Sequence, residues 1–284
     1  MASLKDLRRR IRATTSMQQI FKAMEMVAAA KLRRAQARAL AAAPYSEKIT
    51  EMLTSLAGAA AELEHPLFKV REVKTTALVV VTADRGFAGA YNINVLRPVE
   101  ERLHKSPSGS IQLVALGRKG RDYLKRRGYP MIASHTDLPS EASVEFARKL
   151  TGELVEMYLA GRVDRVEIVY SHFVNALSRK IRSEVFLPIG AEAGAAAPDR
   201  GTLFEPDAEA IFAELLPRYA TAKLYAAMAD ARASEESARM VAMGSARKNA
   251  GELVDSLTLT RNRLRQAAIT KEIAELVGGA EALK

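Results

Sequence analysis

The side chains that could do chemistry in this sequence are few and scattered. The 284 residues include no cysteine, which excludes disulfide bonds, a thiol nucleophile and cysteine metal sites. The four histidines, at positions 65, 104, 135 and 172, lack zinc-ligand spacing. Ser171 and His172 are neighbours in a strand-like segment, so their side chains face opposite ways. The carboxylates are spread over helices as i,i+4 partners of Lys and Arg. The sequence therefore predicts no catalytic site, no metal and no cofactor.

Two glycine-containing turns follow predicted strands, where nucleotide-binding folds place phosphate groups. The first, Thr82–Asn92, has glycines at 86 and 89 beside the polar Asp84, Arg85 and Asn92, and its pattern is neither G-x-G-x-x-G nor G-K-[ST]. The second is Gly117–Gly120. We interpret both as tight turns that begin helices rather than as anion sites. A nucleotide-binding enzyme built on this region is the alternative, which calorimetry with ATP would test.

The positive charge of the chain is large and uneven. The sequence has 43 Lys or Arg against 33 Asp or Glu, a net charge of +10. Residues 1–57 contain 11 basic and 4 acidic side chains, whereas residues 207–284 contain 11 of each. The N-terminal segment should therefore face an acidic partner, which could be nucleic acid, an anionic membrane surface or an acidic protein. Nucleic-acid binding favours aromatic platforms, and this segment has only Phe21 and Tyr45.

The two ends of the chain predict very long helices. Residues 3–57 contain no glycine and one proline, Pro44, and Ser3 is a candidate N-cap with Asp6 at the capping-box position. After Pro217 there is no further proline, and a helix over about 210–277 would be roughly 100 Å long, twice the diameter of a compact globule of this size. Such a helix needs a partner helix. The apolar stripe of the N-terminal helix, typical of a coiled-coil seam, is Leu4, Leu7, Ile11, Met17, Ile20, Phe21, Met24 and Val27.

Between these helices the pattern changes to alternating strands and helices. Short apolar runs predict strands at 77–82, 111–116, 130–134 and 165–170, with 181–187 as an edge strand, and helices at 88–105, 117–127 and 140–161. Residues 188–206 are typical of a flexible linker. We therefore predict an α/β fold class in which a small Rossmann-like domain is inserted into an antiparallel coiled coil. The predicted parts are a coiled-coil helix at 1–57, an α/β domain at 74–190 and a second coiled-coil helix at 207–284.

Several segments resemble the gamma subunit of F-type rotary ATP synthases. They are 19–31 (QIFKAMEMVAAAK), 238–243 (ARMVAM) and 262–273 (NRLRQAAITKEI). Segment 82–92 is similar to the family's S/T-D-R-G-L-C-G-x-x-N, with Ala88 in place of the cysteine. The resemblance covers the whole chain in order. The cysteine-bearing insertion of chloroplast forms is missing, which favours a bacterial origin.

The resemblance implies a central stalk, a rotor shaft that couples proton flow through a membrane ring to ATP synthesis in a hexamer of alpha and beta subunits. It implies one copy per complex, contacts with the epsilon subunit and the c-ring, and a peripheral place at the cytoplasmic face of the bacterial plasma membrane. It also implies a subunit without catalytic residues of its own. A basic coiled-coil protein that binds nucleic acid is the alternative, and a steep salt dependence of DNA binding would mark it.

The resemblance also implies partner-binding residues. Those expected to contact the alpha/beta hexamer are Met24, Lys31, Arg33, Arg34, Arg265, Gln266, Thr270, Ile273, Leu276 and Val277. The first four match a region that faces an acidic loop of the beta subunits. The next three match positions that hydrogen-bond to a loop of one catalytic subunit, and the last three belong to a tip held in an apolar sleeve. Phe204 and Glu205 match the foot, where the membrane ring and epsilon bind.

Overall fold

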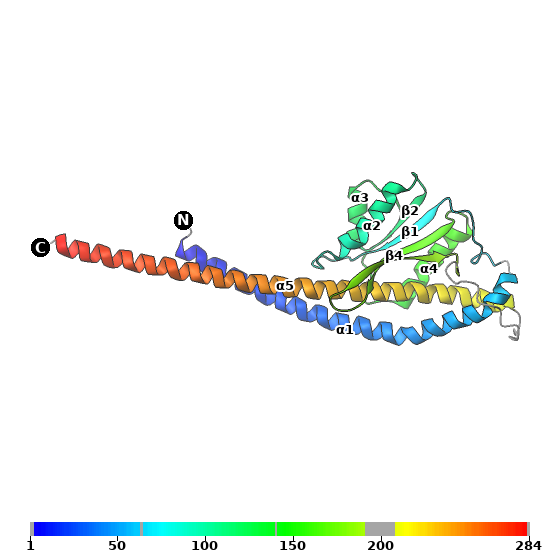
Figure 1. The fold of residues 1–284 in the computed structure, drawn as a ribbon, viewed down its shortest axis with the longest axis horizontal. Coiled ribbons are helices and arrows are strands. Elements are labelled where there is room, and N and C mark those ends of the chain that lie inside the picture. The colour runs from blue at the N-terminus through cyan, green and yellow to red at the C-terminus, as the bar shows by residue number, and fades with distance from the viewer. Residues whose placement is uncertain (1–2, 63–64, 140, 191–207, 283–284) are drawn as a thin grey trace. The chain divides into compact units, whose positions relative to one another are not determined.

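The computed structural model describes residues 3–62, 65–139, 141–190 and 208–282. The chain divides into two compact units, a terminal unit of residues 1–28 and 240–284 and a central unit of residues 29–239. Two long helices, α1 (Leu4–Glu62) and α5 (Ala208–Ala282), each contribute to both units (Figure 1). The long helices predicted at the two ends of the chain are therefore confirmed. Phe204 and Glu205, with most of the predicted linker, lie outside the described residues.

The start of α1 follows from its first residues. Ser3 Oγ accepts a hydrogen bond from the backbone N–H of Asp6 at 3.1 Å and donates one to Asp6 Oδ2 at 2.9 Å. The N-cap role predicted for Ser3 is confirmed, and it satisfies a backbone donor that the first turn would otherwise leave free. The Asp6 carboxylate bonds to the Ser3 hydroxyl rather than to the Ser3 backbone N–H, so the pair is not a full capping box. The hydrogen bonds from Ser3 favour the ionised carboxylate and therefore lower the pKa of Asp6.

In the terminal unit the two helices run antiparallel. A β-carbon added at Gly244 would lie 3.2 Å from Glu25 Oε1, and one added at Gly251 would lie 2.8 Å from Gln18 Nε2. Seven residues forward on α5 thus correspond to seven residues back on α1, which is the register of an antiparallel coiled coil. Arg247 Nε donates to Glu25 Oε2 at 2.8 Å across the same pair of helices. Close approach at the glycines and this ion pair fix the register.

The central unit contains a five-stranded sheet with the order β3-β2-β1-β4-β5. The strands are β1 (Thr76–Val81), β2 (Ile111–Leu116), β3 (Met131–His135), β4 (Arg165–Phe173) and β5 (Arg179–Leu187). The first four are parallel, and β5 is antiparallel to β4 at the edge, as predicted. The chain passes from β3 at one edge to β4 on the other side of β1. The strand order therefore reverses between β1 and β4, at the carboxyl edge where doubly wound folds bind ligands.

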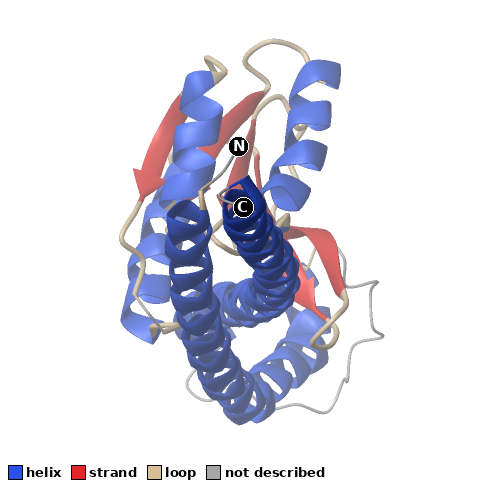
Figure 2. Ribbon diagram, turned by 90° about the vertical axis from the view of Figure 1, so that its left-hand side faces the viewer, coloured by secondary structure: helices blue, strands red, loops and turns tan. Residues whose placement is uncertain are grey.

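Helices cover both faces of this sheet (Figure 2). The helices between the strands are α2 (Tyr91–Lys105), α3 (Arg118–Arg126) and α4 (Val144–Leu159). Because successive side chains of a strand alternate, β1 serves two cores. Leu78 and Val80 pack with residues of α2 and α3, whereas Ala77, Val79 and Val81 pack with α4 and with the parts of α1 and α5 that belong to this unit. The sheet is therefore the middle layer of three.

The turn between β2 and α3 packs closely on the end of β1. Gly117 has φ +96°, and a β-carbon there would lie 2.3 Å from the carbonyl oxygen of Thr82. One at Gly120 would lie 2.6 Å from Thr82 Oγ1, which accepts a hydrogen bond from Gly120 N at 2.9 Å and donates one to Leu116 O at 2.8 Å. Gly117 is thus required by close approach to the backbone of Thr82, and Gly120 by close approach to the Thr82 side chain.

We expect Gly120→Ala to lower the free energy of unfolding by about 2 kcal/mol, because the added methyl overpacks a buried contact and displaces the Thr82 hydroxyl. Denaturant titration of the full chain measures this. The matched control is Gly152→Ala in α4, where nothing lies within 4 Å of the added carbon. That change should stabilise the chain by up to about 1 kcal/mol, since alanine favours helix. Equal effects at the two positions would contradict the packing role of Gly120.

Candidate functional site

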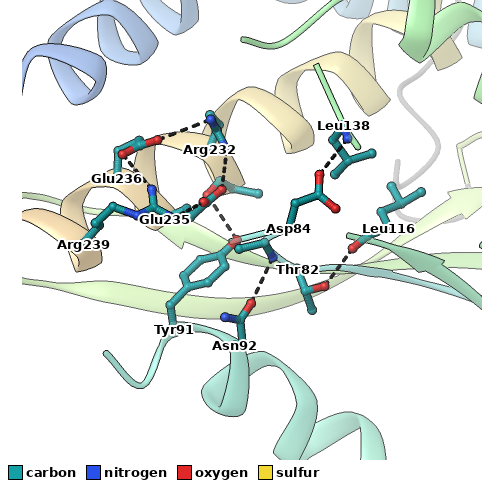
Figure 3. A network of polar contacts seen from close by, with 12 residues as sticks. Thr82, Asp84, Tyr91, Asn92, Leu116, Leu138, Arg232, Glu235, Glu236 and Arg239 are labelled. Carbon is teal, nitrogen blue, oxygen red and sulfur yellow. Dashed lines mark hydrogen bonds and ion pairs between the residues drawn. The ribbon is translucent and has the colours of Figure 1, made fainter. Parts of the chain in front are cut away.

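The carboxylate of Asp84 links neighbouring loops at the carboxyl edge of the parallel strands. Its Oδ1 accepts hydrogen bonds from the backbone N–H groups of Arg118 at 2.8 Å and Asp137 at 3.1 Å, and its Oδ2 accepts one from Leu138 N at 2.7 Å. One carboxylate after β1 therefore holds the turns that follow β2 and β3 (Figure 3). Asp84 is a structural residue here, because backbone donors surround it.

The amides at the start of α3 already have partners. Arg118 N donates to Asp84, Lys119 N to Ala83 O at 3.0 Å and Gly120 N to Thr82 Oγ1. A helix N-terminus binds anions through free N–H groups, and these three are occupied. The geometry thus agrees with the interpretation of Gly117–Gly120 as a tight turn. In the first segment Asn92 Oδ1 accepts from Ala83 N at 2.9 Å, and its interpretation as a tight turn stays a prediction.

The residues of α5 around position 230 cover the same edge. Asp230 Oδ1 accepts a hydrogen bond from Phe173 N at 2.8 Å, and Asp230 Oδ2 contacts His172 Nδ1, both at the end of β4. The Tyr91 hydroxyl donates to Ala231 O at 3.2 Å. Burial, with a smaller contribution from the charge of Glu235, raises the pKa of Tyr91. Helix α5 therefore contacts the loops on either side of the reversal point of the sheet, where a doubly wound enzyme would hold its ligand.

A compact group of charges lies on α5 beside these contacts (Figure 3). Glu235 and Glu236 are only 4% and 1% exposed. Arg232 contacts both carboxylates, at 2.7 Å for Glu235 and 3.3 Å for Glu236, and Arg239 pairs with Glu235 and, at 2.7 Å, with Glu236. Loss of water lowers the pKa of Arg239, but the two glutamates outweigh this and raise it. We name these four residues the α5 charge cluster; its two positive and two negative charges balance.

The sequence pattern identified such pairs as helical i,i+4 partners but did not reveal that they are buried. The missed signal is the set of small neighbours, since Ala233, Ser234, Ser237 and Ala238 are all almost fully buried. Small side chains on every side of a charged group let another layer approach closely. Within the described residues, no group of three metal-binding side chains occurs, and no helix is long and apolar enough to cross a membrane.

The predicted partner-binding residues on α1 are half-buried or exposed. Met24 belongs to the terminal unit and is half-buried. In the central unit Arg33 is exposed, while Lys31 and Arg34 line one small pocket with Arg232. Neither Lys31 nor Arg34 forms an ion pair with a residue that the structure describes. The structure thus brings two of the four predicted residues together.

The predicted residues near the end of α5 are all exposed. Arg265, Gln266 and Thr270 make no side-chain hydrogen bond or ion pair with the described part of the chain. The apolar residues that follow on the same helix are exposed by more than half: Ile273 56%, Leu276 73% and Val277 58%. These side chains contribute little to the fold and are available to a partner.

Comparison with known proteins shows similarity over the whole chain. A family model described as ATP synthase matches residues 3–283. The chain is 45% identical to the ATP synthase gamma chain of Heliobacterium modesticaldum over 291 residues and 47% identical to that of Desulforamulus reducens over 285, covering 100% of both proteins in each case.

Solved structures share the fold at lower identity. One is the Tetrahymena thermophila mitochondrial ATP synthase central stalk and c-ring, with a TM-score of 0.65 and 24% identity over 80% of this chain and 99% of the other. Another is the Euglena gracilis mitochondrial ATP synthase (OSCP, F1 and c-ring), with a TM-score of 0.71 and 21% identity over 99% of this chain and 94% of the other.

We expect Arg239→Met to lower the free energy of unfolding by about 3 kcal/mol, because it leaves two buried carboxylates to share one guanidinium. Thermal or denaturant unfolding of the full chain measures the loss. The matched control is Arg218→Met, which breaks an i,i+4 pair with Glu214 on the same helix whose side chains are 61% and 71% exposed. That change should cost less than about 0.5 kcal/mol. Similar losses in the two variants would show that burial of the cluster is unimportant.

Proposed function

The chain belongs to the family of ATP synthase gamma chains, and we propose that it is the central rotor shaft of an F-type ATP synthase. In this role it couples proton flow through a membrane ring to ATP synthesis or hydrolysis in a catalytic hexamer of alpha and beta subunits. The observation that carries the proposal is that the similarity to gamma chains extends through both long helices as well as the central sheet.

The proposed work of this chain is mechanical, and the reacting groups belong to other subunits. An asymmetric shaft that presses on three equivalent catalytic subunits holds each in a different conformation, and so at a different nucleotide affinity. Such a shaft needs side chains that fix its own geometry. This need is met by Asp84, Asp230 and the α5 charge cluster, because their polar groups form contacts within the central unit.

The C-terminal end of α5 is suited to a contact in which the helix rotates against its partner. Ile273, Leu276 and Val277 expose apolar surface, which gains free energy when a partner covers it. Apolar contact has no preferred direction, so a sleeve around this tip would hold it without fixing one angle. One turn earlier, Arg265, Gln266 and Thr270 supply exposed donors for a loop of one catalytic subunit.

The basic residues of α1 provide the proposed electrostatic contact. Lys31, Arg33 and Arg34 would face an acidic loop of the beta subunits, and Met24 would pack beside it. At the other end, Phe204 and Glu205 would lie at the foot with the epsilon subunit and the membrane ring. We propose that the chain is a peripheral subunit at the cytoplasmic face of a bacterial plasma membrane. Nothing in the comparisons favours the alternative of a nucleic-acid-binding coiled coil.

We expect the chain, mixed with alpha and beta subunits, to form a complex that holds one copy of it per three alpha and three beta subunits. A single asymmetric shaft fills the axis of the hexamer and excludes a second copy. Native mass spectrometry of the purified complex gives the stoichiometry, with alpha and beta alone as the control. Three or six copies per hexamer would contradict the shaft role.

We expect the triple variant R265A/Q266A/T270A to lower the ATP synthesis rate of the assembled complex about tenfold or more, since each exposed group would lose a hydrogen bond to a catalytic subunit. The melting temperature of the isolated chain should stay within about 2 °C of the wild type, because these side chains form no hydrogen bond or ion pair with the residues that the structure describes. Arg97→Ala, an exposed change on α2, is the control. An unchanged synthesis rate would remove these residues from the proposed interface.

A further inference from the structure

A groove of about 850 Å³ in the central unit has no role in the proposed function. Its walls come from α1, the first turns of α4, the last part of β4, the middle of β5, and residues 217–230 of α5. Sites for small molecules in proteins are concave, mostly apolar and of this size, about 300–1,000 Å³. The groove is therefore large enough for a ligand of more than ten non-hydrogen atoms.

Small side chains of α5 line the groove among its longer ones. Ala222, Ala226 and Ala229 follow one another at intervals of four and three residues, which places them on one side of the helix. Tyr170 and Tyr225 flank this alanine face with aromatic surface. A long, narrow apolar body fits such a lining better than a compact polar one.

Apart from the exposed carboxylate of Glu47 on α1, most polar groups that line the groove are already paired. Glu184 accepts a hydrogen bond from the Tyr170 hydroxyl at 2.8 Å, and Asp230 is held by His172 and Phe173 N. Lys223 Nζ donates to Val185 O at 2.6 Å. These groups have little capacity left for a ligand, so the polar end of a ligand would not lie among them.

Arg148 differs from these groups. It lines the groove, it is exposed, and it has no ion pair or hydrogen bond with the described part of the chain. It lies just over one turn after the start of α4, where Ser143 caps the helix and Val144 also lines the groove. The positive end of the α4 dipole and the free guanidinium therefore both favour a negative charge at this end of the groove.

We propose that the groove binds a single-chain amphiphilic anion, with a carboxylate at Arg148 and an acyl chain along the alanine face of α5. The apolar lining and the unpaired cation at one end match the two parts of such a molecule. The proposal is independent of the shaft role, because it rests on the central unit alone.

The test is calorimetric titration of the full chain with dodecanoate and with dodecanol, both below the concentration at which they aggregate. We expect saturable binding of one dodecanoate per chain, and affinity for dodecanol lower by about fivefold to tenfold, because the alcohol lacks the charge that Arg148 would meet. Absence of saturable dodecanoate binding, or equal affinity for the alcohol, would overturn the proposal.

Two variants separate the two parts of the site. Arg148→Gln should weaken dodecanoate about fivefold and leave dodecanol unchanged, and Arg97→Gln, outside the groove, should change neither. Ala226→Trp should fill the groove and weaken both ligands more than about tenfold, whereas Ala213→Trp, an exposed change on the same helix outside the groove, should not. Ala226 is exposed, so the tryptophan variant should fold, and its melting curve checks this. Equal losses at positions 226 and 213 would show that binding occurs elsewhere.

Discussion

Two glutamates and one arginine of α5 are buried, beside a half-buried second arginine, where this helix contacts the carboxyl edge of the sheet, and this contact constrains most of the central unit. A buried charge is costly unless partners surround it. In the α5 charge cluster each carboxylate meets both guanidinium groups. These pairs lie within α5 and move with it, so they make burial of this part of the helix possible without fixing its position. Turning or sliding α5 by one residue would instead break its bonds to the sheet edge, from Phe173 N to Asp230 and from the Tyr91 hydroxyl to Ala231 O. We infer that the cluster allows the burial and that these two bonds fix the setting of the helix against the sheet.

The same contact covers the edge of the sheet at which doubly wound folds bind nucleotides. In such folds the reversal point of the strand order leaves a crevice for a ligand. Here Asp230 binds the end of β4, and Ala231 accepts from Tyr91 after β1, so α5 contacts both sides of that point. The turns after β2 and β3 direct N–H groups to Asp84, and Gly120 N is directed to Thr82. The fold class therefore says little about function, which depends on what occupies the edge of the sheet.

The elements could be predicted from the sequence because their signals are local. The absence of glycine over residues 3–57 and of proline after Pro217 gave the two long helices, and short apolar runs gave the strands to within a few residues. Packing across the chain could not be predicted in the same way. Glu235 and Arg239 show the same i,i+4 spacing as the exposed Glu214 and Arg218, so spacing alone does not distinguish a buried pair from a solvated one. The requirement for glycine at position 120 could not be predicted either, because it comes from contact with Thr82, which lies 38 residues earlier in the chain.

The pairing of acidic with basic side chains explains what the uneven charge of the chain does physically. In the terminal unit, Arg9 contacts Asp6 in an exposed pair, and Glu25 is engaged by Arg247 of α5. The acidic side chains near the N-terminus are thus used within the fold, while most of the arginines there stay exposed and without a carboxylate among the described residues. Exposed like charges along one helix repel one another, which disfavours the isolated chain. An acidic partner removes that repulsion and gains attraction, so the same residues that weaken the free helix strengthen its complex. The positive charge of α1 therefore favours assembly over the isolated chain.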